Sequence, residues 1–332
     1  MKIDSSEIFR IAAAADTARI AVIIPCYRVT DQILSVIGRI GPGIEAIYCV
    51  DDACPDGSGK LIERQSSDPR VKVLHNPVNR GVGGAVLAGY RQALADGFDI
   101  LVKIDGDGQM DPALMPELVR PILSGEADYT KGNRFFFLEH TRGMPFVRLI
   151  GNGMLSFLTK LSSGYWTIFD PTNGYTAIHR SVAEQIVSRR IDERYFFETD
   201  MLLHLYLLRA VIRDVPMASV YADERSNLSV RRVALPFLAK NLRNMLRRFL
   251  VHYLIRDFSL ATLEAIVGAA SLTFGTMFGA IAWGHSYASG APATAGEVMI
   301  AALPILTGMQ LILSALNFDM RNVPAVPRQR PR

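Results

Sequence analysis

The sequence lacks most of the patterns that identify soluble catalytic and disulfide-bonded proteins. Its three cysteines, Cys26, Cys49 and Cys54, show no Cys-x-x-Cys spacing, and the first two lie in apolar runs, which favours buried thiols in a reducing compartment. The chain has no Gly-x-Ser-x-Gly, no Walker loop and no His-Glu-x-x-His, and its six histidines are scattered. A serine triad and a zinc site therefore have no support in the sequence.

A large net charge and a convincing signal peptide are also missing. The 332 residues carry 36 Lys and Arg against 32 Asp and Glu, so the formal charge of +4 is too small to indicate a nucleic-acid partner. Near the N-terminus, Asp16 and Arg19 interrupt any apolar segment that a signal peptide would need. We therefore expect the globular part of the chain to stay in the cytosol.

From Arg19 to about Asp223, short β-rich runs alternate with helical stretches. Strands are predicted at residues 20–27, 44–52, 71–76 and 99–107, with helices at 31–40, 57–65 and 83–97 between them. This alternation predicts an α/β fold with a mostly parallel sheet, in which ligands bind at the carboxyl ends of the strands. The polar clusters at residues 51–58 and 105–112 follow two of these strands.

The segment KIDGDGQMDP carries three aspartates in one turn, Asp105, Asp107 and Asp111. One interpretation is a solvated turn, and the other is a site for an oxygen-binding cation. An EF-hand is excluded because its glycine and glutamate positions hold Met110 and Pro116. The remaining hypothesis is a small Mg²⁺-type site completed by water or substrate phosphates, with Asp111 as the N-cap of a following helix.

Other strand ends carry further candidate binding residues. Asp51 and Asp52 could accept hydrogen bonds from a ribose hydroxyl or a base N–H, whereas Asp56 and Ser58 are predicted to cap the next helix. Gly81 begins a partial dinucleotide fingerprint that lacks its third glycine. A glycine-rich helix start can still lie close to a nucleotide, so Gly81 is a candidate nucleotide contact.

Basic residues near later strands are candidates for an acceptor phosphate. Lys131 and Arg134 end a strand, and Arg180 follows a turn-rich segment; Arg suits phosphate because its fork donates two hydrogen bonds, and ordinary surface positions are the alternative. Glu198 and Asp200 begin a helix and are either catalytic acids or partners of the helix dipole; Asp200 is included among the catalytic candidates.

The composition changes after Ser226. Residues 227–258 form a predicted basic amphipathic helix, either interfacial or an ordinary surface helix, and two apolar runs within residues 259–320 predict transmembrane helices at about 263–284 and 298–318. The link between the runs has no Lys or Arg, whereas both outer flanks, including the basic tail 321–332, do. The positive-inside rule therefore predicts a multi-pass protein of the cytoplasmic membrane, with both termini and the catalytic domain (1–226) in the cytosol.

The segments IIPCY, VDDACPDGS, NRGVGGAVLAGY, KIDGDGQMDP and KGNRF occur in an order and spacing that resemble family-two glycosyltransferases. The similarity extends from Arg19 to Asp223 and is greatest to dolichol-phosphate mannosyltransferases and bacterial polyprenyl-phosphate glycosyltransferases. It implies a glycosyltransferase A-type, Rossmann-like catalytic domain that uses Mg²⁺ or Mn²⁺. Three departures stand out: Arg28-Val29 replaces the usual Asn-Glu, Asn133 replaces a common serine, and the Gln-x-x-Arg-Trp segment of processive synthases is missing.

The resemblance also implies roles for individual residues. In such enzymes the Asp-x-Asp-x-Gln triplet meets the metal and the donor, and further acids meet the nucleoside. On this chain the resemblance assigns Asp105, Asp107 and Gln109 to the metal, Pro25, Tyr27, Asp51, Asp52 and Asp105 to the nucleotide sugar, and Arg134 to the acceptor phosphate. The residues themselves add Gly81 as a candidate nucleotide-sugar contact, and Lys131 and Arg180 as candidates for the acceptor phosphate. The expected catalytic residues are Asp107, Arg134 and Asp200.

The expected activity is an inverting transfer of one sugar from a nucleotide-diphosphate sugar to polyprenyl phosphate (undecaprenyl or dolichyl) at a membrane. Two alternatives stay open: transfer to a hydroxyl of a lipid-linked sugar or other acceptor, and a non-catalytic nucleotide-sugar-binding membrane scaffold. Membrane lipid is an expected partner, nucleic acid is not, and homo-oligomer formation is left open.

Overall fold

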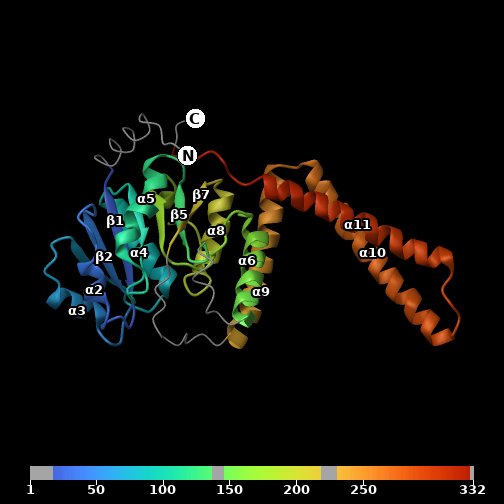
Figure 1. The fold of residues 1–332 in the computed structure, drawn as a ribbon, viewed down its shortest axis with the longest axis horizontal. Helices are drawn as coiled ribbons and strands as arrows, with labels where there is room; N and C mark the ends of the chain where they lie inside the picture. Colours follow the sequence, from blue (N-terminus) through green and yellow to red (C-terminus); the bar gives the residue numbers. More distant parts are fainter. Residues whose placement is uncertain (1–17, 137–145, 218–229, 330–332) are drawn as a thin grey trace. The chain divides into compact units, whose positions relative to one another are not determined.

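The chain divides into two structural units. The computed structural model describes residues 18–136, 146–217 and 230–329 (Figure 1). The first unit comprises Met1–Met245 together with Pro324–Arg332, and the second comprises Leu246–Val323. The predicted domain boundary at residue 226 lies outside the described residues. The basic tail, predicted as a separate segment, groups from Pro324 onward with the first unit.

The first unit is built on a seven-stranded mixed sheet with the order β3-β2-β1-β4-β6-β5-β7 (Figure 1). Of these strands, β6 alone runs antiparallel to its neighbours β4 and β5, and the other pairings are parallel. The strands are β1 (Ile20–Cys26), β2 (Ala46–Asp51), β3 (Val71–His75), β4 (Ile100–Lys103), β5 (Tyr129–Asn133), β6 (Thr176–His179) and β7 (Ile212–Pro216). The prediction of a mostly parallel α/β sheet is confirmed.

The central strands are buried on both faces, which explains their nearly continuous apolar sequences. Every residue of β2 and β4 is buried, as expected for a parallel sheet covered by helices on both sides. Helix α4 packs on β1 and β2, while α5 packs on β5 and β6. The helices of this unit are α2 (Ile33–Gly38), α3 (Ser58–Gln65), α4 (Val82–Ala95), the 3₁₀ turn η1 (Pro112–Leu114), α5 (Met115–Leu123), α6 (Phe146–Ser163), α7 (Arg180–Ile186), α8 (Phe197–Leu207) and most of α9 (Val230–Arg248).

The connectivity gathers the chemically interesting turns at one edge of the sheet. The chain order reverses between β1 and β4, the position at which open α/β sheets bind ligands beyond the carboxyl ends of their strands. The loops after β1, β2, β4 and β5 leave at this edge. Because β6 is antiparallel, the segment that precedes it arrives at the same edge.

The second unit contains the end of α9, a π-helical segment η3 (Phe249–Arg256) and two long helices, α10 (Leu260–Ser289) and α11 (Ala295–Arg321) (Figure 1). Both long helices are apolar enough to cross a membrane, and only 11% and 6% of their most apolar windows are buried within the protein. Capping boxes begin each of them, at Ser259 and Thr294. The predicted helices at 263–284 and 298–318 are therefore confirmed as helices.

A buried charge pair fixes the base of this unit. The Arg248 guanidinium donates to both carboxylate oxygens of Asp319 at 2.6 and 3.0 Å, and the Tyr253 hydroxyl donates to the same carboxylate. These contacts join the start of η3 to the end of α11. Removing one partner of such a buried bidentate pair would leave an uncompensated charge.

Candidate active site

The acidic turn leaves the sheet directly after β4. This strand pairs with β1 only as far as Lys103, which lies opposite Ile23, and the chain then turns away through Asp105 and Asp107. Gly108 adopts φ +77°, a left-handed conformation that favours glycine, and allows the chain to reverse direction. The turn therefore presents its carboxylates at the carboxyl edge of the sheet beside the end of β1.

The rest of the turn divides into an open part and a structural part. The backbone N–H of Gln109 donates to Asp107 Oδ1 at 3.0 Å, and the Gln109 side chain is exposed. Asp111 instead accepts a hydrogen bond from the Ala113 N–H at 3.1 Å and precedes Pro112 at the start of η1. The predicted capping role of Asp111 is confirmed.

A buried lysine organises the carboxylates around the turn, and the sequence reasoning missed it. Lys103 is 1% exposed, and its ammonium lies 2.9 Å from Asp105 Oδ1 and 3.1 Å from Glu198 Oε1. Burial by itself lowers the pKa of Lys103, but the two carboxylates outweigh it and raise that pKa above its ordinary value. Lys103 is therefore a permanent cation that orients Asp105 and links the turn to the first residues of α8.

Gly174 packs directly against Lys103 and Asp105. A Cβ added at Gly174 would overlap Lys103 Nζ and would stand 2.6 Å from Asp105 Oδ2. No side chain larger than hydrogen is accommodated there without moving the lysine or the aspartate. Gly174 therefore contributes to the site by the room it leaves.

The residues of the turn suit a hard divalent cation in their chemistry. Asp105, Asp107 and Gln109 offer carboxylate and amide oxygens, the donors that Mg²⁺ and Mn²⁺ prefer. Within the described residues, no group of three or more His, Cys, Asp or Glu side chains could hold a metal ion. Two acids and an amide match a site that a ligand diphosphate completes, rather than an all-protein cage.

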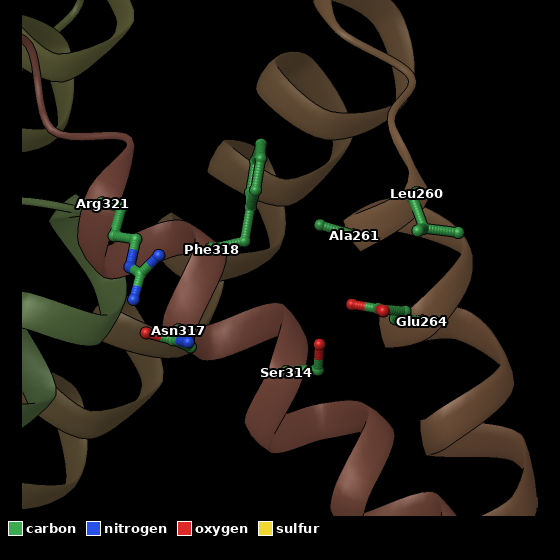
Figure 2. A pocket seen from close by; sticks show the side chains of 7 residues that line it. All are labelled: Leu260, Ala261, Glu264, Ser314, Asn317, Phe318 and Arg321. Carbon is green, nitrogen blue, oxygen red and sulfur yellow. The ribbon is translucent and has the colours of Figure 1, made fainter.

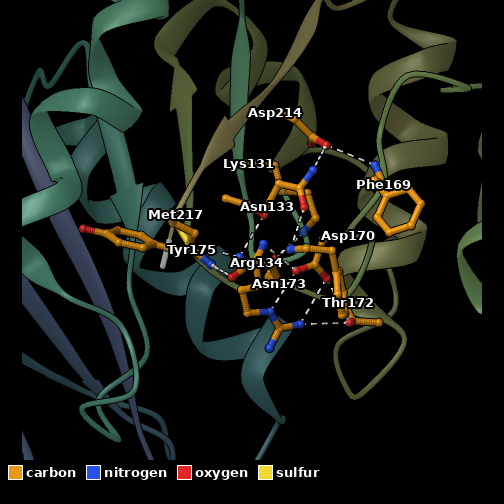
Figure 3. Close-up of polar contacts among 12 residues, drawn as sticks. Lys131, Asn133, Arg134, Phe169, Asp170, Thr172, Asn173, Tyr175, Asp214 and Met217 are labelled. Carbon is orange, nitrogen blue, oxygen red and sulfur yellow. Dashed lines mark hydrogen bonds and ion pairs between the residues drawn. The ribbon is translucent and has the colours of Figure 1, made fainter. Parts of the chain in front are cut away.

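A second polar group surrounds Arg134 at the end of β5 (Figure 3). Its Nε and Nη2 donate to the two carboxylate oxygens of Asp170 at 2.8 and 3.0 Å, and Nη2 lies 3.4 Å from Thr172 Oγ1. Asp170 is fully buried, while 34% of the Arg134 side chain is exposed. The carboxylate thus fixes the orientation of a partly exposed guanidinium.

The same group contains the buried Lys131, whose ammonium donates to the Asn173 carbonyl (Figure 3). Burial lowers the pKa of Lys131 to about 8, against the opposing effects of Glu198 and Asp170. Glu198, which pairs with Lys103 at 3.1 Å, also raises the pKa of Lys131 through its charge. Lys131 itself is enclosed by the protein and takes part in the wall of the site rather than in its opening.

Asp214 of β7 completes this wall. One of its carboxylate oxygens accepts hydrogen bonds from Asn133 Nδ2 at 2.9 Å and from the Phe169 N–H at 3.1 Å, and the other is buried without a hydrogen-bond partner. Burial raises the pKa of Asp214 to about 6. This carboxyl group therefore changes its charge near neutral pH.

The acids after β2 hold the surrounding loops. Asp51 accepts hydrogen bonds at 2.7 Å from the N–H groups of Cys54 and Gly59, so it caps α3. The prediction that Asp56 and Ser58 cap this helix is wrong, because the cap position is Gly57 without a side-chain hydrogen bond.

Asp52 fixes the glycine-rich loop in the same manner. Its carboxylate accepts from Asn76 Nδ2 at 2.8 Å, from the Arg80 N–H at 3.0 Å and from the Gly81 N–H at 2.7 Å. Gly81 has φ +86°, and a Cβ there would stand 2.6 Å from the Glu193 carbonyl oxygen. The glycine thus serves a tight loop contact, and its N–H is used within the protein.

The end of β1 contributes a more open surface. Pro25 is partly exposed within the strand, and 44% of Tyr27 is exposed, with the Arg28 guanidinium 5.5 Å from its ring centre. These side chains lie at the same edge as Asp105, because β1 and β4 run in parallel. The structure therefore brings Pro25, Tyr27 and the acidic turn together.

Two predicted site residues lie elsewhere. Arg180 follows the antiparallel β6, so it lies at the opposite edge of the sheet, where its N–H donates to the Asp99 carbonyl and its side chain pairs with Glu184 at 2.7 Å. Asp200 is buried and accepts hydrogen bonds from the Asp192 N–H and from Asn244 Nδ2. The acid of α8 that joins the site is Glu198, two residues earlier.

Comparison with known proteins identifies the family of the chain. The model of the glycosyl transferase family 2 matches residues 21–187. Polyprenol monophosphomannose synthase of Mycolicibacterium smegmatis is 32% identical over 195 residues, which cover 57% of this chain and 73% of the relative. Undecaprenyl-phosphate mannosyltransferase of Micrococcus luteus is 31% identical over 206 residues, which cover 61% of this chain and 84% of the relative.

Solved structures agree in fold. Glucosyl-3-phosphoglycerate synthase from Mycobacterium tuberculosis, crystallised with Mn²⁺, uridine diphosphate and glucosyl-3-phosphoglycerate, superposes with a TM-score of 0.54 at 20% identity. The match covers 75% of this chain and 86% of that chain. A likeness at this level of identity establishes the A-type glycosyltransferase architecture of the catalytic unit.

Proposed function

Because the chain belongs to glycosyl transferase family 2 and is a glycosyltransferase, we propose that it moves one sugar from a nucleotide-diphosphate sugar to the phosphate of a polyprenyl phosphate. The relatives named as polyprenol monophosphomannose synthase and undecaprenyl-phosphate mannosyltransferase support this acceptor class. The observation that carries the proposal is that an acidic turn and an arginine oriented by Asp170 lie at the same edge of the sheet, with Glu198 paired to the lysine that holds Asp105.

The acidic turn is the donor side of the proposed site. Asp105, Asp107 and Gln109 would hold a Mg²⁺ or Mn²⁺ ion, which supplies positive charge against the leaving nucleotide diphosphate. Lys103 holds one Asp105 oxygen at 2.9 Å, and this leaves the other oxygen of that carboxylate available to the donor side. Structural neighbours crystallised with Mn²⁺ or Mg²⁺ and uridine diphosphate support the use of a divalent ion.

For the nucleoside we propose the surface formed by Pro25 and Tyr27. Asp51 and Asp52 border it, and each already accepts at least two hydrogen bonds from the protein. A carboxylate has about four lone-pair positions, so a ribose hydroxyl or base N–H can still be added. Their main contribution is to fix the two loops that enclose the nucleoside.

Arg134 is the acceptor side. Its guanidinium is fixed by Asp170, so an incoming phosphate meets an oriented donor and loses little side-chain entropy on binding. A phosphate monoester has its second pKa near 6, so its oxygen is largely ionised at neutral pH and needs no strong general base. Attack of that oxygen on the anomeric carbon, opposite to the leaving diphosphate, would invert the configuration.

A membrane location fits this acceptor. α9 exposes a stripe of leucines at helical spacing on its outer side, whereas its polar residues Asn241 and Asn244 are buried against the catalytic unit. The neighbouring α6, which α9 meets through a 2.7 Å hydrogen bond from Ser162 to Asn241, exposes Met154 and Phe157. Such a surface needs an apolar cover, which a bilayer interface provides. Within the first unit, the exposed leucines of α9 are Leu235, Leu238 and Leu242.

The C-terminal tail supports the predicted orientation of the two apolar helices. The N–H groups of Arg328 and Gln329 donate to the buried carboxylate of Asp128 at 2.9 and 3.0 Å. Both ends of the α10–α11 pair therefore lead into the same folded unit, as a two-helix membrane hairpin requires. Together with the basic flanks, this favours cytosolic termini and a multi-pass cytoplasmic-membrane protein.

A donor screen tests the proposal. The purified chain would be incubated with undecaprenyl phosphate, Mg²⁺ or Mn²⁺ and a panel of nucleotide-diphosphate sugars, and the lipid products identified by mass spectrometry. We expect one donor to give the lipid phosphate plus a single sugar residue. Release of free nucleotide without any glycolipid, or a product with several sugars, would argue against the proposal.

Substitution of Glu198 distinguishes a hydroxyl acceptor from the proposed phosphate acceptor. Transfer to a hydroxyl group requires a general base, and Glu198 is the carboxylate of α8 that lies at the site. If the acceptor were a hydroxyl, Glu198→Gln would abolish transfer. With a phosphate acceptor we expect this variant to keep measurable turnover.

A further inference from the structure

A pocket lies between the two apolar helices of the second unit. It has a volume of about 380 Å³ and opens between the start of α10 and the end of α11 (Figure 2). Its lining mixes apolar and polar side chains in a segment that is otherwise strongly apolar. The residues that define its chemistry are Leu260, Glu264, Ser314, Asn317, Phe318 and Arg321.

The packing of the two helices explains why the pocket is at this end. α10 and α11 touch through small residues, since a Cβ at Gly308 would stand 2.7 Å from the Gly268 carbonyl oxygen, and one at Gly275 would stand 2.7 Å from that of Ala301. Such backbone contacts are typical of helices that associate within a bilayer. Four residues before Gly268 the small residues give way to Glu264, and the pocket opens.

The pocket has the depth of a lipid head-group region. Ser314 to Arg321 spans about 10 Å of helix at a rise of about 1.5 Å per residue, and this segment ends where the chain leaves α11. The polar zone of a bilayer leaflet is only several ångströms thick beside a hydrocarbon core of about 30 Å. In a spanning hairpin, the pocket would therefore face the head groups of one leaflet.

The charges in the pocket are of opposite sign. Glu264 and Arg321 both line it, and among the described residues neither takes part in an ion pair. Arg321, Asn317 and Ser314 can donate hydrogen bonds to a phosphate, and Glu264 can accept them from an ammonium group. A phosphate monoester, which carries nearly two negative charges, would be repelled by Glu264.

We propose that this pocket binds the head group of a zwitterionic phospholipid that bears a primary amine, of the phosphatidylethanolamine class. The inference rests on the membrane insertion proposed above. The phosphodiester lies against Arg321 and the amine against Glu264, while Leu260 and Phe318 contact the first carbons of the acyl chains. None of its lining residues belongs to the candidate active site, and the pocket would select the lipid that surrounds the hairpin.

Competition between two phospholipids tests this assignment. The full chain in detergent is incubated with equal amounts of phosphatidylethanolamine and phosphatidylglycerol, without donor sugar, and the retained lipid is measured by native mass spectrometry. We expect the ethanolamine lipid to be retained in excess. Glu264→Gln should reduce that excess about tenfold, and Arg321→Gln should reduce retention of both lipids, because each removes a charge-assisted contact.

Matched controls come from charged residues of the same unit that do not line the pocket. Asp257→Asn and Arg256→Gln should leave the lipid preference unchanged. Equal retention of the two lipids by the wild type, an unchanged preference in Glu264→Gln, or displacement of the ethanolamine lipid by polyprenyl phosphate would each overturn the assignment.

The lipid measurement is independent of catalysis. Flotation with vesicles of the same two lipids reports whether each variant still binds membranes. A chain that forms no glycolipid but keeps the lipid preference would contradict the proposed function and leave this inference standing. A chain that transfers sugar normally but shows no lipid preference would contradict this inference and leave the proposed function standing.

Discussion

Replacing Lys103 with methionine should uncouple the acidic turn from α8. The ammonium lies 2.9 Å from Asp105 and 3.1 Å from Glu198, and the lysine is 1% exposed, so the change leaves two neighbouring carboxylates without their shared cation. Removing one partner of a buried ion pair costs about 3–5 kcal/mol, and the lower end applies because 28% of the Asp105 side chain is exposed. We therefore expect a loss of about 3 kcal/mol in the free energy of unfolding.

Thermal unfolding of the full chain in detergent measures this loss. For a domain of this size, about 3 kcal/mol lowers Tm by about 6–12 °C. Turnover should also fall about 10- to 100-fold at a temperature where the variant is folded, because Asp105 loses the contact that orients it.

The matched variant is Lys103→Met combined with Glu198→Gln, which removes one of the two unpaired carboxylates. We expect part of the lost stability to return, with a coupling energy of about 1 kcal/mol or more. A Tm for Lys103→Met within about 1 °C of the wild type would refute the reasoning. So would a double variant whose loss equals the sum of the two single losses.

Other predictions follow from single contacts. Asp107→Ala should abolish transfer while the Tm and membrane flotation stay unchanged, and normal turnover would contradict its role on the donor side. Arg134→Lys should raise the acceptor KM about tenfold with little change in the donor KM, because a lysine cannot replace the guanidinium fork held by Asp170. An acceptor KM equal to that of the wild type would contradict the role of Arg134 in acceptor binding. The raised pKa of Asp214 means that the folded state binds the proton of this carboxyl group more tightly than the unfolded state does. The stability of the wild type relative to Asp214→Asn should therefore fall by about 2 kcal/mol as the pH rises from about 4 to 6. A difference in Tm between the two proteins that stays constant over this range would contradict the prediction. Asp128→Asn should lower Tm by about 4 °C, because it weakens the acceptor of the Val211, Arg328 and Gln329 N–H groups, and a Tm equal to that of the wild type would contradict this role.

The fold could largely be predicted because local signals and the overall architecture agree. Alternating apolar runs and helical stretches indicated the sheet, and the Asp111–Pro112 pair indicated a helix start that the structure confirms. The two apolar runs near the C-terminus are long enough that only long helices suit them. The direction of β6 could not be predicted in the same way, because antiparallel and parallel strands have similar compositions. Arg180 was therefore grouped with Lys131 and Arg134, although it lies at the opposite edge of the sheet.

The site was predicted less completely because spacing along the chain does not show which carboxylates meet. Glu198 and Asp200 are two residues apart at the start of one helix, yet one joins Lys103 and the other is buried against Asn244. Lys103 was overlooked inside an apolar strand, although a lysine two residues before a cluster of acids is itself a signal for a buried ion pair. Asp51 was predicted as a ligand contact, and the structure also gives it the capping role that was expected of Asp56.

The central claim is that the attacking atom belongs to a phosphate. Phosphorus NMR of the lipid product from the active donor tests it directly, because attack by the phosphate converts a monoester into a diester. We predict that the monoester signal of the polyprenyl phosphate disappears as one diester signal grows, and that neither change occurs with Asp107→Ala. A glycolipid whose phosphorus remains a monoester would contradict the account.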